Sequence, residues 1–271
     1  MTYRSLLFVP GSRADRFAKA AASGADAVCI DLEDAVAPAD KDRARRDTLA
    51  FLAAPPAGAA VGFRINTLRS LDGLRDVVAL ADSGARPAFV MIPKAETPEE
   101  IAQLRAVTGV AALWPLLEHP GALPRLHDIA GAVGAQGGLM LGGVDYAAAL
   151  GREPTWEALH HARASLVAAA AAHGCASIDA PFLDVKDGAG LAAETARVRA
   201  MGFTGRSSIH PAQLATINAI FTPSAEEISK AEKIAAAYDA AGGGVSLVDG
   251  ALVEAPVRRR AERVLKERRD G

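Results

Sequence analysis

The sequence predicts a (β/α)₈ TIM barrel with a C-terminal helix and hairpin extension, and three observations support this prediction. Short apolar runs alternate with longer helical segments and form eight strand–helix units in sequence order. The runs are continuously apolar, which is typical of parallel strands that are covered on both faces. The chain has 271 residues, half of them hydrophobic, which is enough for one barrel of about 250 residues.

The predicted elements follow one another with short connections. The strands cover residues 5–10, 27–33, 59–66, 89–94, 111–118, 138–145, 176–180 and 205–210. The helical patterns cover residues 13–23, 40–52, 70–83, 98–107, 121–133, 155–173, 191–201 and 211–220. A doubly wound open sheet is the alternative, but Pro10-Gly11-Ser12-Arg13 after the first strand is not a GxGxxG turn, and the sequence has no P-loop pattern.

An extension follows the last barrel helix. Ser224 and Glu227 have the spacing of a capping box, which predicts a helix from there to about residue 241. Asp249-Gly250 between two short apolar runs predicts a β-hairpin. Because a lone two-stranded hairpin is marginally stable in water, we expect it to pack on the barrel or on a neighbouring subunit. The predicted domains are a catalytic barrel over residues 1–222 and the extension over residues 223–271.

The charge balance excludes two classes of partner. With 30 basic and 32 acidic side chains the net charge is −2, so we expect neither a nucleic acid nor a membrane as partner. One local excess of basic residues occurs near the C-terminus. We interpret this segment as a solvated helix, with a phosphate-binding or subunit-contacting segment as the alternative. The basic residues are Arg258, Arg259, Arg260, Arg263, Lys266, Arg268 and Arg269.

The cysteines and the N-terminus favour a cytoplasmic protein. Cys29 and Cys175 lie far apart in apolar stretches and form no CxxC pair, so we expect reduced core thiols. The apolar run 6–9 is too short for a signal peptide, and no run approaches the roughly 18 residues of a membrane helix.

Polar side chains end nearly every predicted strand. In a (β/α)₈ barrel the carboxyl ends of the strands form the catalytic face, so this asymmetry predicts an active site there. The groups at these ends are Asp31, Glu33, Asp34, Arg64, Asn66, Lys94, Glu118, His119, Asp145, Asp179 and His210.

Two different sets of carboxylates are candidates for a metal site. The segment Cys29-Ile30-Asp31-Leu32-Glu33-Asp34 places three carboxylates after one strand, and it is the first candidate. Glu118 and Asp145 end neighbouring strands and are the better candidates for a Mg²⁺ ion that keeps water and substrate oxygens as further ligands. The alternative role for each of these two residues is to cap the following helix. Asp31 and Glu33, on one side of their strand, then act as supporting carboxylates.

Two cations stand at the same face. Arg64 is a candidate for holding a substrate carboxylate or a developing enolate oxygen, and a salt bridge to Asp31 or Glu33 is compatible with that role. Lys94 is a candidate substrate-binding residue that the same carboxylates orient. Schiff-base chemistry at Lys94 is the less favoured alternative, because its sequence neighbours are not apolar enough to lower its pKa.

The motifs taken together resemble the citrate lyase β-subunit-like proteins of the HpcH/HpaI aldolase/citrate lyase family, in order along nearly the whole chain. They are Arg4-Ser5-Leu6-Leu7-Phe8-Val9-Pro10-Gly11, Asp31-Leu32-Glu33-Asp34-Ala35-Val36, Arg64-Ile65-Asn66, Pro93-Lys94, Leu116-Leu117-Glu118, Gly142-Gly143-Val144-Asp145, Gly202-Phe203-Thr204-Gly205, Ile209-His210-Pro211-Ala212-Gln213 and Phe221-Thr222-Pro223-Ser224. The chain departs from the family pattern at His119-Pro120, where Thr or Ser usually follows the metal-ligating Glu, and at Glu254, where several relatives have Asp.

The resemblance implies a Mg²⁺-dependent carbon–carbon lyase that cleaves or forms a β-hydroxyacyl-CoA thioester, such as citryl-CoA or malyl-CoA, to an oxo acid and an acyl-CoA. It implies Glu118 and Asp145 as metal ligands, Arg64 on the oxo-acid oxygen and Arg13 near the CoA phosphates. It also implies oligomers, often homotrimers, in which Glu254 enters a neighbour's site. The carboxylate that moves the proton is then Glu254 of a neighbour, or one of the cluster over residues 31–34, such as Asp31 or Glu33.

Two other functions remain open from the sequence. The first is a Mg²⁺-dependent aldolase that acts on a small oxo acid without CoA. The second is a β subunit or scaffold that needs an acyl carrier protein as partner.

Overall fold

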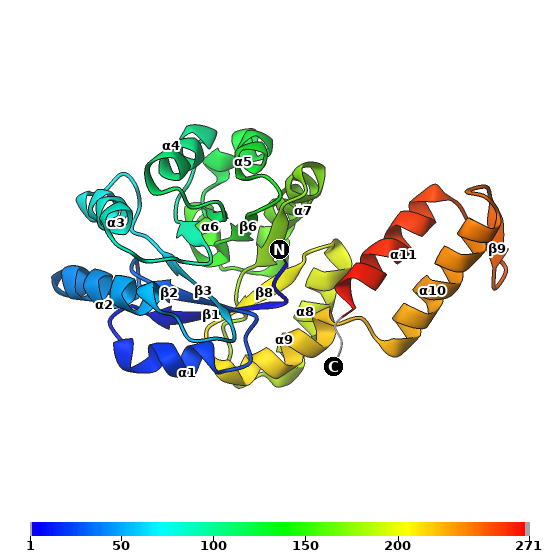
Figure 1. Cartoon of the computed structure of the whole chain (residues 1–271), viewed down its shortest axis with the longest axis horizontal. Coiled ribbons are helices and arrows are strands. Elements are labelled where there is room, and N and C mark those ends of the chain that lie inside the picture. The colour runs from blue at the N-terminus through cyan, green and yellow to red at the C-terminus, as the bar shows by residue number, and fades with distance from the viewer. Residues whose placement is uncertain (1, 269–271) are drawn as a thin grey trace. The chain divides into compact units, whose positions relative to one another are not determined.

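The structure, a computed structural model, describes residues 2–268, and Arg269 of the basic segment lies outside the described residues. Eight parallel strands, β1 to β8, close into a barrel in sequence order, with β1 pairing both β2 and β8 (Figure 1). Helices connect the strands, as expected for parallel pairs, which need crossover connections. The TIM-barrel prediction is confirmed, and the open-sheet alternative is wrong because the sheet has no edge between β1 and β8.

The element bounds agree with the predictions to within a few residues in most cases. The strands are β1 Ser5–Pro10, β2 Ala27–Asp31, β3 Ala60–Arg64, β4 Val90–Ile92, β5 Leu113–Leu117, β6 Gly138–Leu141, β7 Ala176–Asp179 and β8 Gly205–Ser208. The helices are η1 Ala14–Arg16, α1 Phe17–Ala21, η2 Pro38–Asp40, α2 Lys41–Ala53, α3 Leu71–Asp82, α4 Pro98–Thr108, η3 Pro120–Arg125, α5 Leu126–Val133, α6 Gly143–Ala149, α7 Trp156–His173, α8 Gly188–Met201, η4 Pro211–Gln213 and α9 Leu214–Phe221.

One predicted strand end is wrong. The sixth strand stops at Leu141 rather than at Asp145, and Asp145 lies in the first turn of α6. Gly142 and Gly143 explain the difference, because glycines weaken a strand and offer no side chain to pack on the sheet. The chain therefore turns directly from β6 into a helix, and Asp145 reaches the catalytic face from that helix.

The barrel interior is filled in layers by alternate residues of each strand. Trp114 of β5 lies at its centre, with ring centroids 5.8 Å from Tyr3 and 6.0 Å from Phe89. Glycines on neighbouring strands make room for these rings: a Cβ at Gly62 would lie 2.6 Å from the Phe89 ring, and one at Gly138 would lie 2.5 Å from the Trp114 ring. Large rings thus face glycines, which lets the interior reach the density of a packed core.

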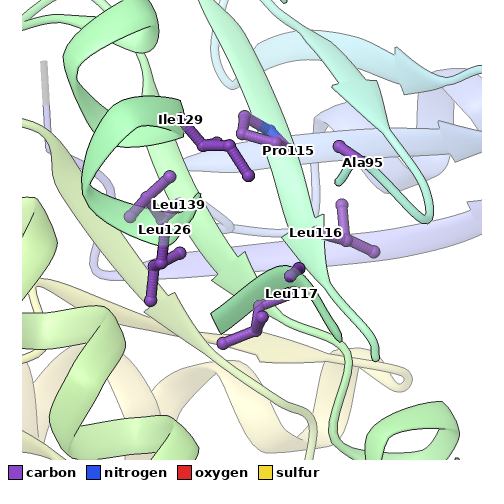
Figure 2. Close-up of a pocket in the computed structure, with 8 residues that line it drawn as sticks. Ala95, Pro115, Leu116, Leu117, Leu126, Ile129 and Leu139 are labelled. Atoms are coloured by element: carbon purple, nitrogen blue, oxygen red, sulfur yellow. The ribbon is translucent and has the colours of Figure 1, made fainter. Parts of the chain in front are cut away.

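A second apolar layer fills the space between the barrel and its helices. Figure 2 shows Leu126 and Ile129 of α5 facing Pro115 and Leu117 of β5 and Leu139 of β6. All the side chains that line this crevice are apolar. The crevice therefore belongs to the packing of α5 on the sheet and offers no polar group that could orient a ligand.

The chain divides into two compact units, residues 1–218 and 219–271. The second unit contains the elements of the extension: α10 Ala225–Ala240, the hairpin strands β9 Ser246–Val248 and β10 Ala251–Val253, and α11 Ala255–Glu267. The predicted capping box is present, since Ser224 accepts from the N–H of Glu227 and Glu227 from that of Ser224. The hairpin is present too, and Asp249 and Gly250 take the positive φ angles, 49° and 78°, that its two-residue turn requires.

No helix among residues 2–268 is long and apolar enough to cross a membrane. Cys29 and Cys175 are both buried and unbonded to each other, as the sequence predicted.

Replacing Trp114 by Ala should lower the free energy of unfolding by about 3–5 kcal/mol, because a fully buried aromatic side chain is lost and a cavity remains. Urea unfolding followed by circular dichroism measures this change. Val107→Ala on the exposed face of α4 is the control, with an expected change of at most about 0.5 kcal/mol. Equal effects of the two substitutions would contradict the described core.

Candidate active site

The site is the polar continuation of the apolar barrel layers. Because strand side chains alternate between the two faces, a residue two positions beyond a core residue points into the barrel mouth. Asp31 follows Cys29 in this way, Arg64 follows Gly62, and Glu118 follows Leu116. The register pairs Asp31 of β2 directly with Arg64 of β3. Strand geometry therefore brings residues far apart in sequence into one charged layer.

Arg64 is the centre of this layer. Its Nε and Nη2 each donate to Asp31 at 2.7 Å, which is a bidentate pair. Its Nη1 lies 3.0 Å from Oε2 of Glu33 and 3.7 Å from Oε1 of Glu118, and its Nη2 lies 3.7 Å from Asp34. The salt bridge that the sequence allowed is thus present to both Asp31 and Glu33, and Arg64 is 9% exposed.

Asp31 and Glu33 differ in how fully their oxygens are used. Asp31 also accepts the backbone N–H groups of Glu33 and Ala35, so each of its two oxygens has two donors. Oε1 of Glu33 accepts from the Lys94 ammonium at 2.7 Å. Oε2 of Glu33 is buried, accepts no hydrogen bond within the described part of the chain, and lies in an ion pair 3.0 Å from Nη1 of Arg64. Both oxygens of Asp31 are therefore fully used in holding Arg64 and the main chain, whereas Oε2 of Glu33 is held only by its ion pair with Arg64.

The pKa values of the two glutamates are shifted upward. Burial is the main cause of the raised pKa of Glu33, and it outweighs the opposing charges of Arg64 and Lys94. Burial raises the pKa of Glu118 to about 8, and the negative charges of Glu33 and Asp145 add to this shift. These shifts follow from an excess of carboxylates over cations in one buried layer.

Lys94 is a protonated partner of Glu33. Burial lowers its pKa, but the hydrogen bond and the charge of Glu33 outweigh burial, so the net shift is upward. A Schiff base requires the unprotonated amine, so this environment disfavours the Schiff-base alternative. The ammonium also lies 3.9 Å from Asp34, which is exposed.

Glu118 and Asp145 form the candidate metal site. Neither caps a helix with its side chain: Gly142 precedes α6 without a side-chain cap, and His119 caps η3 by accepting from Gly121 at 3.0 Å. Within residues 2–268 the Asp145 carboxylate has no hydrogen bond or ion pair. Asp145 is nevertheless close enough for its charge to raise the pKa of Glu118.

The donor set fits Mg²⁺ rather than a metal with a complete protein cage. No three His, Cys, Asp or Glu side chains in the described ranges are grouped so that they alone could hold an ion. Mg²⁺ accepts one or two carboxylates and takes its other ligands from water and substrate oxygens. Gly142 opens the space for such a ligand pair, because a Cβ there would lie 2.1 Å from Cγ of Glu118.

Several predicted site residues lie outside this layer. Arg13 is exposed and pairs with Asp15 at 2.7 Å. Glu254 is exposed at the N-terminus of α11 in the second unit. Asp179 points away from the barrel interior, where it pairs with Arg163 of α7, so its expected place in the catalytic face is wrong. The alternation explains this, because the preceding residue, Ile178, is the one in the barrel core.

Two contacts in the site were not predicted from the sequence. The Arg64 guanidinium lies 5.6 Å from the ring centroid of Phe8, which stands two residues beyond Leu6 on β1. The same two-residue rule that places Asp31 would have found Phe8. Arg69 donates to the main-chain carbonyl of Lys94 at 2.9 Å, and no sequence pattern indicates such a contact.

The chain belongs to a known family, and its relatives share nearly its whole length. Residues 4–211 match the family HpcH/HpaI aldolase/citrate lyase. An L-malyl-CoA/beta-methylmalyl-CoA lyase of Cereibacter sphaeroides is 33% identical over 97% of this chain and 94% of its own length. A (3S)-malyl-CoA thioesterase of the same species is 36% identical over 93% of this chain and 90% of its own.

A solved structure agrees over nearly the whole chain. CitE of Mycobacterium tuberculosis in complex with magnesium, acetoacetate and coenzyme A superposes with a TM-score of 0.81 at 33% identity, covering 98% of both chains. The predicted family is confirmed by these matches.

Replacing Gly142 by Ala should weaken Mg²⁺ binding by about 10–100-fold, because the new Cβ displaces the Glu118 side chain. Isothermal titration calorimetry of metal-free protein measures the affinity. Gly188→Ala, whose Cβ would meet nothing within 4 Å, is the matched control and should bind as the parent does. An unchanged affinity in the Gly142 variant would contradict the described position of Glu118.

The raised pKa of Glu118 predicts a pH dependence of stability in metal-free protein. The folded pKa of about 8 lies above the ordinary 4.5, so the unfolded state releases this proton first as the pH rises. The free energy of unfolding should therefore fall between about pH 4.5 and 8, by at most about 1.4 kcal/mol per pH unit from this group.

Urea unfolding at several pH values in EDTA tests this prediction. Glu118→Gln should show a smaller fall than the parent protein, and Glu157→Gln, at an exposed carboxylate, should show the parent's fall. The same pH dependence in the parent and in Glu118→Gln would show the predicted shift to be wrong.

Proposed function

Because the chain belongs to the HpcH/HpaI aldolase/citrate lyase family, we propose that it is a Mg²⁺-dependent carbon–carbon lyase acting on a β-hydroxyacyl-CoA thioester. The expected enzyme class and metal agree with the relatives described above, which are named for malyl-CoA chemistry or bind magnesium and coenzyme A. The substrate class is a thioester such as malyl-CoA, β-methylmalyl-CoA or citryl-CoA. The products are an oxo acid and the shortened acyl-CoA.

One observation carries this proposal: five carboxylates face two cations in the barrel mouth. The carboxylates are Asp31, Glu33, Asp34, Glu118 and Asp145, and the cations are Arg64 and Lys94. The local charge is negative, which favours a divalent cation over an anionic substrate alone. Glu118 and Asp145 would hold Mg²⁺, which when bound supplies Lewis-acid polarisation of the oxo-acid carbonyl.

Arg64 and Glu33 supply the protein's part of the chemistry. In the cleavage direction the substrate hydroxyl gives its proton to a base as the carbon–carbon bond breaks, and its oxygen becomes the carbonyl of the oxo acid. The bonding electrons move to the thioester, which leaves as an enolate and then takes up a proton. Glu33 suits the base, because its Oε2 accepts no hydrogen bond among the described residues, is held only by its ion pair with Arg64, and belongs to a carboxyl whose pKa is raised. Arg64 stabilises charge on the oxo-acid oxygen. Asp31 positions Arg64.

Three further assignments belong to the proposal. Arg13 contacts the CoA phosphates. The chain forms an oligomer, and we favour a homotrimer, in which Glu254 completes a neighbour's site as the enolate's proton donor. Exposed apolar side chains support an oligomer, since such faces mark interfaces: Leu71, Leu74 and Val78 on α3, and the cross-strand pair Leu247 and Leu252 on the hairpin. The two buried, unpaired cysteines support a cytoplasmic location.

One relative favours a second candidate reaction. The matching (3S)-malyl-CoA thioesterase makes thioester hydrolysis the second candidate, in which water rather than an enolate carbon is the second participant. The CoA-independent aldolase and the carrier-protein-dependent β subunit remain as alternatives, and their tests need further substrates: free oxo acids with aldehydes for the first, and an acyl-carrier-protein thioester for the second.

The test is a panel of malyl-CoA, β-methylmalyl-CoA, citryl-CoA and citramalyl-CoA, each with Mg²⁺ or with EDTA. We expect at least one thioester to give oxo acid and acyl-CoA in equal amounts, without free thiol, and only with Mg²⁺. Glu118→Ala should reduce this turnover by about 10³-fold or more, and Glu157→Ala should not.

The contrary outcomes are distinct. Release of free CoA thiol in step with substrate loss would assign the hydrolase. Turnover of free oxo acids and aldehydes without CoA would assign the aldolase. Full activity in EDTA would contradict every form of the proposal that uses a metal.

A further inference from the structure

Lys94 has an unusual backbone conformation at the mouth of the barrel. Its φ is 53°, in the left-handed region, and among residues 2–268 the only other non-glycine residue with positive φ is Asp249 in the hairpin turn. A non-glycine residue adopts this conformation at a cost, and such residues persist where the surroundings hold them in place. The hairpin geometry explains Asp249, whereas Lys94 lies in a turn after β4 and needs another explanation.

Three hydrogen bonds hold Lys94, and each uses a different part of the residue. Its main-chain N–H donates to Oε2 of Glu118 at 2.9 Å. Its ammonium donates to Oε1 of Glu33 at 2.7 Å, and its carbonyl accepts from Nη1 of Arg69 at 2.9 Å. Lys94, just after β4, therefore links the residues that follow β2 and β5. The left-handed conformation directs the main-chain N–H toward Glu118, while the side chain of Lys94 extends to Glu33.

The choice of residue type supports a functional reason for this conformation. Pro followed by a residue with positive φ is typical of type II turns, where Gly or Asn is normally found. A glycine in place of Lys94 would carry the same N–H without strain, but it would leave Glu33 without the ammonium. Lys at this position therefore combines a backbone role at Glu118 with a side-chain role at Glu33.

We infer that Lys94 is a positioning residue for the metal ligand Glu118, acting through its left-handed main chain and not through its charge. This inference rests on the proposed function, since it takes Glu118 as a Mg²⁺ ligand. The N–H fixes Oε2 of Glu118, which leaves Oε1 toward Arg64 at 3.7 Å and toward the space next to Gly142. Groups that orient metal ligands in this way commonly determine affinity by about 10–100-fold.

The first experiment uses three variants that all lack the ammonium, so any difference in Mg²⁺ affinity among them reports the main-chain conformation and not the charge. Lys94→Gly and Lys94→Asn tolerate positive φ, whereas Lys94→Val, being β-branched, does not. Mg²⁺ affinity is measured by isothermal titration calorimetry on full-length, metal-free protein, and folding by circular dichroism. We expect the Gly and Asn variants to bind within about threefold of the parent and the Val variant to bind about tenfold to a hundredfold more weakly.

The second experiment acts on the same turn from outside the site. Arg69 and Arg125 are exposed to similar extents, 46% and 43%, and pair with Glu100 and Glu99 of α4 at 2.9 and 3.2 Å. Of these two arginines, only Arg69 also donates to the carbonyl of Lys94. Arg69→Ala should weaken Mg²⁺ binding severalfold, and the matched control Arg125→Ala should leave it unchanged. If the Val variant fails to fold, this pair and the Gly and Asn variants decide the question.

Equal loss of Mg²⁺ affinity in the Gly, Asn and Val variants would overturn the inference, because the ammonium would then be the determinant. Parent-like affinity in the Val variant or in Arg69→Ala would also overturn it. If the parent binds Mg²⁺ but cleaves no thioester, the proposed function fails while the ranking of affinities still decides the role of Lys94. If the parent binds no Mg²⁺ at all, the proposed function and the inference about Lys94 both fail.

Discussion

The site depends on one buried arginine that holds a group of carboxylates together. Taking carboxylates out of water is costly unless a cation and hydrogen bonds compensate, and breaking such a pair leaves an uncompensated charge. Arg64 provides this compensation: it pairs bidentately with Asp31 and approaches Glu33 and Glu118. The compensation is incomplete, as the pKa of Glu118 near 8 indicates. A bound divalent cation would complete it, so the same electrostatic imbalance that destabilises the metal-free site favours metal binding.

The packing of the barrel explains why these groups meet. Interior layers pair large side chains with glycines on neighbouring strands, so that Trp114 fills the space beside Gly138 and Glu118 fills the space beside Gly142. Asp31 and Arg64, the last residues of β2 and β3, thus continue the packed layers of the barrel, and the other charged groups of the site lie just beyond the ends of their strands. Because the strands are parallel and the register pairs Asp31 with Arg64, the layer is rigidly supported from below by Cys29, Leu116 and the aromatic core. Such support is what holds ligands in a productive geometry.

Features that depend on a few neighbouring residues were predictable from the sequence. Features that depend on where a strand ends, or on which side of the strand a side chain lies, were not. The eight strands, the Ser224 capping box and the Asp249-Gly250 turn follow from patterns within a few residues. Asp145 and Asp179 were placed less well, because two glycines ended β6 early and because one step along β7 decides whether a side chain faces the core. The left-handed conformation of Lys94 has no local signal, since Lys is not a residue that favours it. It arises from partners on three other segments.

The central claim is that Glu118 and Asp145, rather than the carboxylates that follow β2, ligate the metal. A crystal structure of the protein loaded with Mn²⁺, which takes the same oxygen ligands as Mg²⁺ and is located by its anomalous scattering, tests this claim most directly. We predict one anomalous peak within coordination distance of both carboxylates, with water completing the shell and with Asp31 still bonded to Arg64. A peak coordinated directly by Asp31 or Glu33, or no peak between Glu118 and Asp145, would contradict it.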